Sequence, residues 1–402
     1  MSKLAVDGGK PVRSSLLPYG RQTIDEADIA AVVDVLRSDW LTTGPKIAEF
    51  ESAFAAEVGA AHAVAVSSGT AALHAAAFAA GVGPGDEVIT TPLTFVASAN
   101  CARYLGAEPR FADVEPDTLN ISVDAVRQRL TDKTRAIVAV DFSGQPADLE
   151  ELSALASSRG AVLIEDACHA FGAQYRGRRV GSIAPLTVFS THPVKHITTG
   201  EGGVITTNNA ELARRMRRFR NHGITTDARE RQNNGSWYYE MVDLGFNYRI
   251  TDLQCALGIS QLRHAERWHA RRIEIARRYT DSLADLPDLR LPLVRADRVS
   301  GWHVYVIGVD AQGLRPGVGR AEVFRALRAE NIGVNVHYIP VTWQPYYRSR
   351  GHGPGECPVA DHAYEQLITL PLFPAMRDRD VADVVEAVHK VMSAYSAARQ
   401  TA

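Results

Sequence analysis

The chain has 402 residues, of which 46% are hydrophobic and 22% are charged, with a formal net charge of −2 at pH 7. This length suits one large and one smaller domain, and the near-neutral charge predicts no general attraction to nucleic acid or to an anionic membrane. No run of about 18 apolar residues predicts a membrane span, and four cysteines without a CxxC pair favour a reducing compartment, so we expect a cytoplasmic protein.

The first elements along the chain are helical. Thr23 and Glu26 have the T-x-x-E spacing of a capping box, and apolar residues at helical spacing follow to about Ser38. A hydroxyl-rich loop then precedes a second expected helix over residues 46–58.

From residue 63 onward, short apolar strands alternate with helical stretches. Strands are expected at residues 63–66, 87–91, 136–140, 161–165, 188–191 and 204–207. Helices are expected between most of them, at residues 70–80, 95–105, 123–130 and 149–158. Such alternation predicts a mostly parallel sheet flanked by helices, with its ligand beyond the carboxyl ends of the strands.

The last third of the chain begins with one long amphipathic helix, expected over residues 251–283. Pro287 and Pro292 follow it and predict a domain boundary, which gives a large α/β domain over 1–285 and a small α+β domain over 286–402. Within the small domain we expect regular structure at residues 302–309, 320–330, 334–338 and 378–395.

A single lysine, Lys195, stands on the loop between two β-branched runs, 187–191 and 204–207. Pro193 excludes a helix interior there, and the glycines at the end of the loop allow a tight return close to a bound group. A rigidly held lysine of this kind is typical of a Schiff-base lysine. A surface lysine in a β-turn is the alternative, with about even weight.

Four other loops contain residues suited to ligand binding, and each of them also has a purely structural interpretation. The sequence SSGT at residues 67–70 predicts an anion cradle at a helix N-terminus or an ordinary N-cap. Asp166, at a strand end, could hold a protonated pyridine nitrogen or cap a turn, and Phe95 could lie on a planar ring or belong to the core. Asn247 and Arg249 could meet anionic groups or serve as capping and surface residues.

Several competing sites are disfavoured by their motifs. His192 and His196 have the spacing of a helical zinc pair, but Pro193 separates them and no third ligand is apparent, so no metal site is expected. The absence of G-x-G-x-x-G and of a Walker motif weighs against NAD and ATP. A phosphate cradle, an aromatic residue, a strand-end Asp, Ser190 and Lys195 in this order instead predict a pyridoxal phosphate site.

The motifs SSGTAALH, TPLTFVASAN, EDACHAFGA, FSTHPVKHITTGEGG and GFNYRITDLQ resemble those of the DegT/DnrJ/EryC1/StrS family. The resemblance extends over nearly the whole chain. It implies a fold-type I enzyme that depends on pyridoxal 5′-phosphate, with Lys195 as the Schiff-base lysine and proton carrier and Asp166 as the partner of the pyridine nitrogen. The resemblance further assigns ring stacking to Phe95, a 3-hydroxyl contact to His169, phosphate binding to Gly69, Thr70 and Ser190, phosphate binding from a neighbouring subunit to Asn247, and sugar-nucleotide binding to Thr42, Arg249, His337 and Tyr338.

The reaction that this resemblance implies is amino transfer from L-glutamate to C4 of a UDP-linked 4-keto-6-deoxy-N-acetylhexosamine, in a homodimer with its active site at the interface. Other sugars, transfer to C3 or to a cyclitol remain open. A dehydratase is less expected, because the family's dehydratases replace the lysine by histidine and Lys195 is present. A non-catalytic ligand-binding protein would have lost Lys195 or Asp166.

Overall fold

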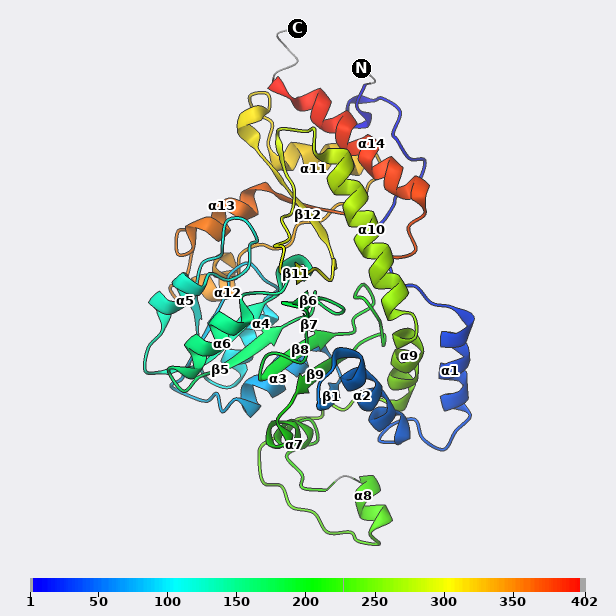
Figure 1. The fold of residues 1–402 in the computed structure, drawn as a ribbon, viewed down its shortest axis with the longest axis vertical. Coiled ribbons are helices and arrows are strands. Elements are labelled where there is room, and N and C mark those ends of the chain that lie inside the picture. The colour runs from blue at the N-terminus through cyan, green and yellow to red at the C-terminus, as the bar shows by residue number, and fades with distance from the viewer. Residues whose placement is uncertain (1–2, 227, 398–402) are drawn as a thin grey trace.

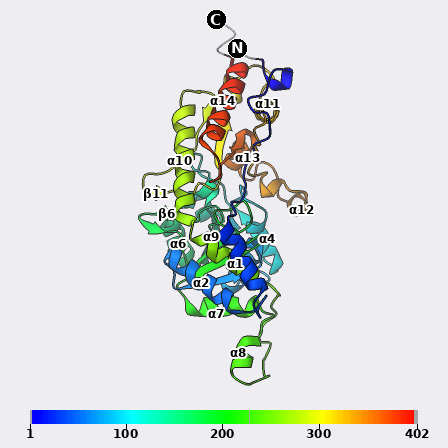
Figure 2. The same ribbon diagram turned by 90° about the vertical axis from the view of Figure 1, so that its right-hand side faces the viewer.

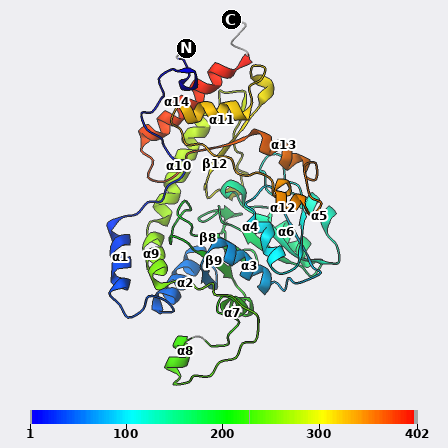
Figure 3. The same ribbon diagram turned by 180° about the vertical axis from the view of Figure 1, so that it is seen from behind.

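A computed structural model describes residues 3–226 and 228–397. A large α/β sheet forms the middle of the molecule, and the C-terminal elements and both ends of the chain lie at one end of the long axis (Figure 1). The short helix α8 (Ala228–Asn233) projects at the opposite end, as the views from the side and from behind also show (Figures 2 and 3). No helix in the described part of the chain combines the length and apolarity needed to cross a membrane.

The N-terminal segment contains η1 (Ala5–Asp7), α1 (Glu26–Leu36) and α2 (Pro45–Val58). The expected capping box at Thr23 is wrong, because Asp25 caps α1 instead. The Asp25 carboxylate accepts from the amides of Ala27 and Asp28 at 3.0 and 3.1 Å, and the Asp28 carboxylate accepts from the Asp25 amide at 3.1 Å. An aspartate is at least as good an N-cap as a threonine, so the helix begins two residues later than the motif predicted.

The central sheet confirms the prediction of a mostly parallel α/β sheet. Its seven strands are, in spatial order, β1 (His62–Val66), β9 (Gly203–Thr207), β8 (Leu186–Ser190), β5 (Val162–Asp166), β4 (Thr134–Val140), β2 (Glu87–Thr90) and β3 (Glu108–Phe111). The strands from β3 to β8 are parallel, and β9 pairs antiparallel with both β1 and β8. Strand β3 was not predicted, because its sequence Glu-Pro-Arg-Phe has the proline and charges of an edge strand.

Helices cover both faces of this sheet, which is why most of its strands are buried along nearly their whole length. On one face lie α3 (Gly69–Ala79), α4 (Ala97–Tyr104) and α7 (Ala210–Phe219), packed on residues such as Val88 and Val138. On the other face lie α5 (Val123–Arg129), α6 (Leu149–Ser157) and α2, with α5 and α6 on residues such as Ile89 and Ile137. A 3₁₀ turn, η2 (Phe142–Gly144), follows β4.

The expected single helix over residues 251–283 is two helices, α9 (Asp252–Leu262) and α10 (Ala265–Leu283). Helix α9 packs on α1 and α2, whereas α10 continues to the C-terminal elements (Figure 1). The break is at His264, whose imidazole lies 2.9 Å from the carboxylate of Asp25. Because no glycine or proline stands there, the tertiary contacts and not the local sequence divide the helix.

The C-terminal elements surround a second, antiparallel sheet of β10 (Leu289–Arg290), β12 (Tyr305–Val309) and β13 (Leu367–Leu370). The helical elements of this part are η3 (Ala311–Gly313), α11 (Arg320–Ala329), η4 (Val341–Trp343), α12 (Pro345–Arg348), α13 (Pro358–Gln366) and α14 (Asp378–Tyr395). The expected extended segment at 334–338 is not a strand, since Asn335 alone bridges to Thr369. Leu4 and Leu17 from the N-terminus pack into this second core.

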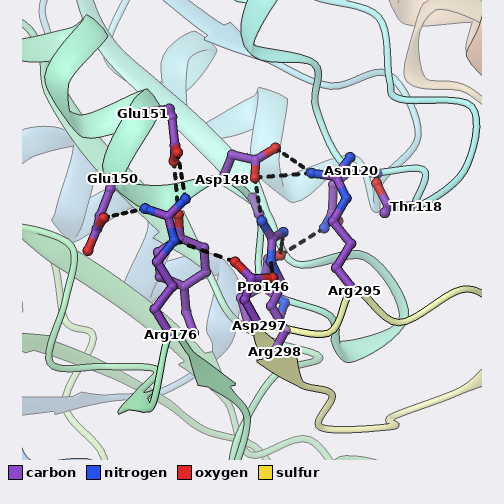
Figure 4. Close-up of polar contacts among 12 residues, drawn as sticks. Thr118, Asn120, Pro146, Asp148, Glu150, Glu151, Arg176, Arg295, Asp297 and Arg298 are labelled. Atoms are coloured by element: carbon purple, nitrogen blue, oxygen red, sulfur yellow. Dashed lines mark hydrogen bonds and ion pairs between the residues drawn. The ribbon is translucent and has the colours of Figure 1, made fainter.

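A small third sheet of β11 (Arg298–Val299), β6 (Gln174–Tyr175) and β7 (Arg178–Arg179) joins the two main sheets. Around it, Arg176 contacts Glu150 and Glu151, and Arg298 contacts Asp148 (Figure 4). These contacts tie the segment that precedes β12 to the first turn of α6.

Candidate active site

One cavity of about 490 Å³ opens beyond the carboxyl ends of the parallel strands, where the sequence predicted the ligand. The central sheet and loops of the C-terminal part of the chain both contribute to its wall. Nine of the residues singled out from the sequence line it: Gly69, Thr70, Phe95, Asp166, His169, Ser190, Lys195, His337 and Tyr338.

Lys195 lies half-buried in the wall of this cavity, on the loop between the paired strands β8 and β9. The loop is held closed by the hydroxyls of Thr191 and Thr199, which lie 2.6 Å apart. A side chain at Gly202 would meet both hydroxyls at 2.2–2.3 Å, so glycine is required there. Burial lowers the pKa of Lys195, while nearby Cys168 and Asp166 oppose that shift.

Asp166 ends β5 and is 5% exposed. Its Oδ2 accepts a hydrogen bond from Ser98 Oγ at 2.7 Å, and its Oδ1 accepts from the Cys168 amide at 3.3 Å. Both donors are neutral, so the described contacts leave the negative charge of this buried carboxylate without a cation at hydrogen-bond distance. A buried carboxylate needs a positive partner, and a protonated pyridine nitrogen would be one.

The N-terminus of α3 lies beside Ser190 in the wall of the cavity. Ser68 is the N-cap, since its Oγ accepts from the Ala71 amide at 3.1 Å, so the plainer explanation of SSGT holds for this hydroxyl. The amides of the first turn have no acceptor within the helix, and the hydroxyls of Thr70 and Ser190 lie beside them. A Cβ at Gly69 would stand 3.1 Å from Ser190 Cβ, so glycine allows the first turn of α3 to approach Ser190 closely, and free amides at a helix N-terminus suit an anion such as phosphate.

Two aromatic groups and a histidine complete this wall. His169 is buried, and its Nε2 lies 2.9 Å from Tyr338 Oη. Its Nδ1 has no hydrogen-bond partner among the described residues, which is unusual for a buried nitrogen. Phe95 is 58% exposed and therefore is not the core residue that was its alternative. A buried carboxylate with only neutral donors, an anion cradle, a buried nitrogen without a partner among the described residues and an exposed aromatic ring together fit pyridoxal phosphate.

Three of the residues chosen from the sequence lie elsewhere. Thr42 is exposed and bridges to Thr251, and Asn247 is exposed and bridges to Asn221. Arg249 donates to Asn221 Oδ1 at 2.8 Å and lines a second cavity of about 590 Å³. This second cavity is strongly basic, because its wall also contains Arg214, Arg217, Arg218, Arg220 and Arg229.

The inner arginines of α7 do not form a solvated helical face. Arg217 and Arg220 are half-buried and both contact the carboxylate of Glu51. Arg215 donates to the carbonyls of Ala79 and Phe78 at 2.9 and 3.1 Å.

One residue beside Lys195 was not found from the sequence. His303 lines the same cavity, and its Nε2 lies 3.4 Å from Lys195 Nζ. The two residues are 108 positions apart, and His303 stands just before an apolar strand with no motif around it. Only a view of the assembled fold brings them together.

Comparison with known proteins gives a consistent result. A model of the DegT/DnrJ/EryC1/StrS aminotransferase family matches residues 22–389. The spore coat polysaccharide biosynthesis protein SpsC of Bacillus subtilis is 44% identical over 383 residues, which cover 94% of this chain and 98% of SpsC. The putative sugar aminotransferase Spr1654 of Streptococcus pneumoniae, in its PMP form, superposes with a TM-score of 0.88 at 31% identity, over 94% of this chain and 99% of Spr1654. Helicobacter pylori PseC, an aminotransferase involved in the biosynthesis of pseudoaminic acid, superposes with a TM-score of 0.87 at 30% identity, over 94% of this chain and all of PseC.

Proposed function

This chain belongs to the DegT/DnrJ/EryC1/StrS aminotransferase family and is a transaminase of PLP fold type I that depends on pyridoxal 5′-phosphate, and we propose that it transfers an amino group from L-glutamate to C4 of a UDP-linked 4-keto-6-deoxy-N-acetylhexosamine. That is the reaction of a UDP-4-amino-4,6-dideoxy-N-acetyl-β-L-altrosamine transaminase. The observation that carries the proposal is the convergence of Lys195 and Asp166 on one cavity. The likeness to PseC favours a substrate of the pseudaminic-acid type.

In the proposed site, the α3 N-terminus with Gly69, Thr70 and Ser190 binds the cofactor phosphate. Asp166 holds a proton on the pyridine nitrogen, which its burial and neutral hydrogen-bond donors support. Phe95 packs on one face of the ring, and His169 contacts the 3-hydroxyl group. When bound, pyridoxal phosphate supplies an electron sink for the charge left when a proton is removed next to the amine.

Lys195 has two proposed roles. It anchors the cofactor in the resting protein, and its amine, once displaced by L-glutamate, removes the proton from the α-carbon of that amino acid. The second role requires a neutral amine, which the lowered pKa of buried Lys195 supports. The same amine returns a proton to the sugar carbon in the second half of the reaction.

The proposed nucleotide-sugar site includes His337 and Tyr338 of the same cavity. Thr42 and Arg249 lie outside this cavity. Arg249 lines the basic cavity and Thr42 lies beside it, so in the proposed homodimer both would reach the substrate of the neighbouring subunit. A diphosphate is an anion that arginine side chains bind well, so the arginines there that do not pair with Glu51 support a nucleotide-linked substrate.

We also propose a homodimer, in which Asn247 contacts the cofactor phosphate of the neighbouring subunit. The arm over residues 224–226 and 228–246, which contains α8, projects from the molecule (Figure 1) and exposes Trp237 by 84% and Leu244 by 76%. Exposed apolar groups of this size on one arm favour burial against another protein surface. Light scattering of the full chain checks this, and a monomer at micromolar concentration would contradict it.

The division into residues 1–285 and 286–402 is part of the same proposal. Lys195 and Asp166 come from the first part, and His337 and Tyr338 come from the second. The active site then lies between the two, and the proposed location of the reaction is the cytoplasm.

The test of this proposal has two steps. The purified full-length protein should be yellow with bound cofactor, should lose the colour with L-glutamate and should regain it with 2-oxoglutarate. Mass spectrometry and NMR of the product then compare UDP-linked 4-keto, dTDP-linked 4-keto and 3-keto sugars as acceptors. Colour changes without amination of the UDP-linked 4-keto sugar would reject the proposed acceptor and keep the transaminase.

A second candidate function is amination of a different sugar nucleotide for a surface polysaccharide. The 44% identity to the spore coat polysaccharide protein SpsC favours it. The same acceptor panel separates the two, because the preferred acceptor in this case would not be the UDP-linked N-acetylhexosamine.

A further inference from the structure

The segment over residues 300–303 follows strand β11 of the third sheet and leads to His303 in the wall of the active-site cavity. Its backbone is restrained by an unusual set of side-chain hydrogen bonds. All four of its carbonyl oxygens accept a hydrogen bond from a side chain. His269 Nε2 donates to residue 300 at 2.9 Å, and His196 Nε2 donates to residue 301 at 2.8 Å. Arg272 Nη1 donates to residues 302 and 303 at 3.2 and 3.1 Å. Side-chain donors to four successive carbonyls fix this backbone more tightly than a loop requires.

Backbone contacts restrain the same segment from the side of η2. The Gly301 amide donates to the Gly144 carbonyl at 2.8 Å, and the His303 amide donates to the Ser143 carbonyl at 3.1 Å. Trp302 has a φ of 49°, in the left-handed region that a bulky residue rarely adopts. Such a conformation persists when its surroundings over-determine it, and it is typical of functional sites.

Arg272 forms no ion pair among the described residues, and its hydrogen bonds there all go to backbone carbonyls. Its side chain is 1% exposed, and it also donates to the Leu372 carbonyl at 3.1 Å. Burying a guanidinium against carbonyls alone is costly, so its retention needs a reason beyond packing. What Arg272 holds in place is the ring of His303, through the backbone of residues 302 and 303.

The ring of His303 is 4% exposed and faces Lys195, with Nε2 at 3.4 Å from Nζ. Its Nδ1 has no hydrogen-bond partner among the described residues. A lysine ammonium group can only donate, so the imidazole must be neutral and must accept through Nε2 when Lys195 is charged. When Lys195 is neutral, one N–H directed to His303 fixes rotation of the amine and therefore the direction of its lone pair.

We propose that His303 is a positioning residue for Lys195, whose Nε2 accepts a hydrogen bond from the amine and directs the lone pair into the cavity. This inference rests on the proposed role of Lys195 as the cofactor lysine. The four hydrogen bonds from side chains to the carbonyls of segment 300–303 hold the His303 imidazole at a fixed position relative to the loop that carries Lys195.

Removal of this acceptor changes the protonation of Lys195 in a defined direction. A hydrogen bond to the ammonium form stabilises the charge, so its loss makes the amine neutral at lower pH. The amine of Lys195 in the variant would then react more readily with an external reagent. It would nevertheless catalyse more slowly, because no acceptor orients its lone pair. The other titratable or charged groups near Lys195 stay in place: Asp166, Cys168, His169, His196, Arg272 and His337.

The experiment compares His303→Gln with His303→Asn in the full-length protein. The Gln amide reaches about as far as imidazole Nε2, and the Asn amide is one methylene shorter. Labelling of Lys195 with an amine-selective reagent is followed by peptide mass spectrometry against pH, after the cofactor is removed. We expect His303→Asn to lower the labelling midpoint by about 1 pH unit and kcat by about 10- to 100-fold at unchanged KM for L-glutamate. The Gln variant should retain both values within about threefold.

Equal labelling midpoints for the wild type and His303→Asn would overturn the proposal, and equal losses in the Gln and Asn variants would reduce His303 to a structural role. If circular dichroism shows that the Asn variant is unfolded, His303→Ala takes its place. His389→Gln is the matched control, because His389 lies on α14 outside the cavity and its Nε2 bonds the Ser282 carbonyl of α10 at 2.7 Å. Borohydride reduction of the holoprotein separately tests Lys195, since cofactor fixed to another lysine rejects the proposed function without changing the labelling result.

Discussion

Two clusters of charged and polar side chains in this molecule are built in opposite ways. Around the small third sheet, every arginine has a carboxylate (Figure 4). Arg295 lies 3.1 Å from Asp148, Arg176 lies 2.7 Å from Glu151, and Arg298 contacts Asp148 while its side chain is 2% exposed. Such a cluster satisfies its charges internally and needs no ligand.

The cavity around Lys195 contains buried polar atoms that lack partners within the described structure. Asp166 has neutral donors only, and Nδ1 of both His169 and His303 has no hydrogen-bond partner. An unpaired buried polar group costs about 1–3 kcal/mol. The ion pairs of the first cluster are therefore explained by their contribution to the stability of the fold. The unpaired groups of the second cluster are explained by a bound group that would pair with them.

The largest effect should come from the lysine of the incomplete cluster. We expect Lys195→Ala to lower the rate of amino transfer by more than about 10³-fold, because it removes the proposed cofactor anchor and the proposed proton carrier. Lys46→Ala is the control, since that amine pairs with Glu49 at 2.6 Å on the surface. The measurement is 2-oxoglutarate release from L-glutamate, and near-normal release by the Ala variant would remove Lys195 from the mechanism.

The second effect concerns the carboxylate without a cation. Asp166→Asn keeps the hydrogen bond from Ser98 but loses the charge, so cofactor should still bind while the rate falls by about 10²-fold. Stopped-flow absorbance after addition of L-glutamate gives this rate. The control is Asp132→Asn, whose side chain is 99% exposed. A full rate in Asp166→Asn would contradict the proposed contact with the pyridine nitrogen.

The completed cluster should respond through stability instead. Arg298→Met leaves Asp148 partly unpaired and should lower the free energy of unfolding by about 3 kcal/mol, with at most a modest change in kcat. Arg176→Met should cost less than about 1 kcal/mol, because the Arg176 side chain is 40% exposed. Urea unfolding measures both, and equal losses would remove the distinction between buried and exposed members.

A pH-dependent effect on stability concerns a buried acid pair next to Asp166. Burial raises the pKa of Glu165 to about 7 and also raises the pKa of Asp141, so the folded protein holds protons that the unfolded chain releases. Their contribution to stability is complete below about pH 4.5 and is lost as the pH rises through about 7.

Glu165→Gln removes one of these carboxyl groups. The wild type should therefore lose about 2 kcal/mol more than this variant between pH 5 and pH 8 in urea unfolding. Parallel stability curves for the two proteins would show that the pair does not take up a proton on folding.

Much of the fold could be predicted from local sequence patterns. Apolar runs separated by helical stretches predicted six strands of the central sheet to within a few residues, because burial on both faces demands such runs. Patterns failed where neighbours decided the outcome. The polar edge strand β3 forms by pairing with β2, and α9 and α10 separate at His264 because they pack on different parts of the molecule.

The sequence alone determined the chemistry that this protein carries. Lys195 between paired strands, Asp166 at a strand end and the SSGT helix start are local features, and each stands where the pattern predicted it. Short-range spacing fixes these positions because strand and helix geometry follow from neighbouring residues.

Only the tertiary structure decided which groups meet. It brought His303 to Lys195 across 108 positions and separated Thr42, Asn247 and Arg249 from the cavity. It also left His169 Nδ1 unpaired and closed the ion pairs of Arg298. Contacts between distant segments depend on how whole elements pack, and no local periodicity encodes that packing.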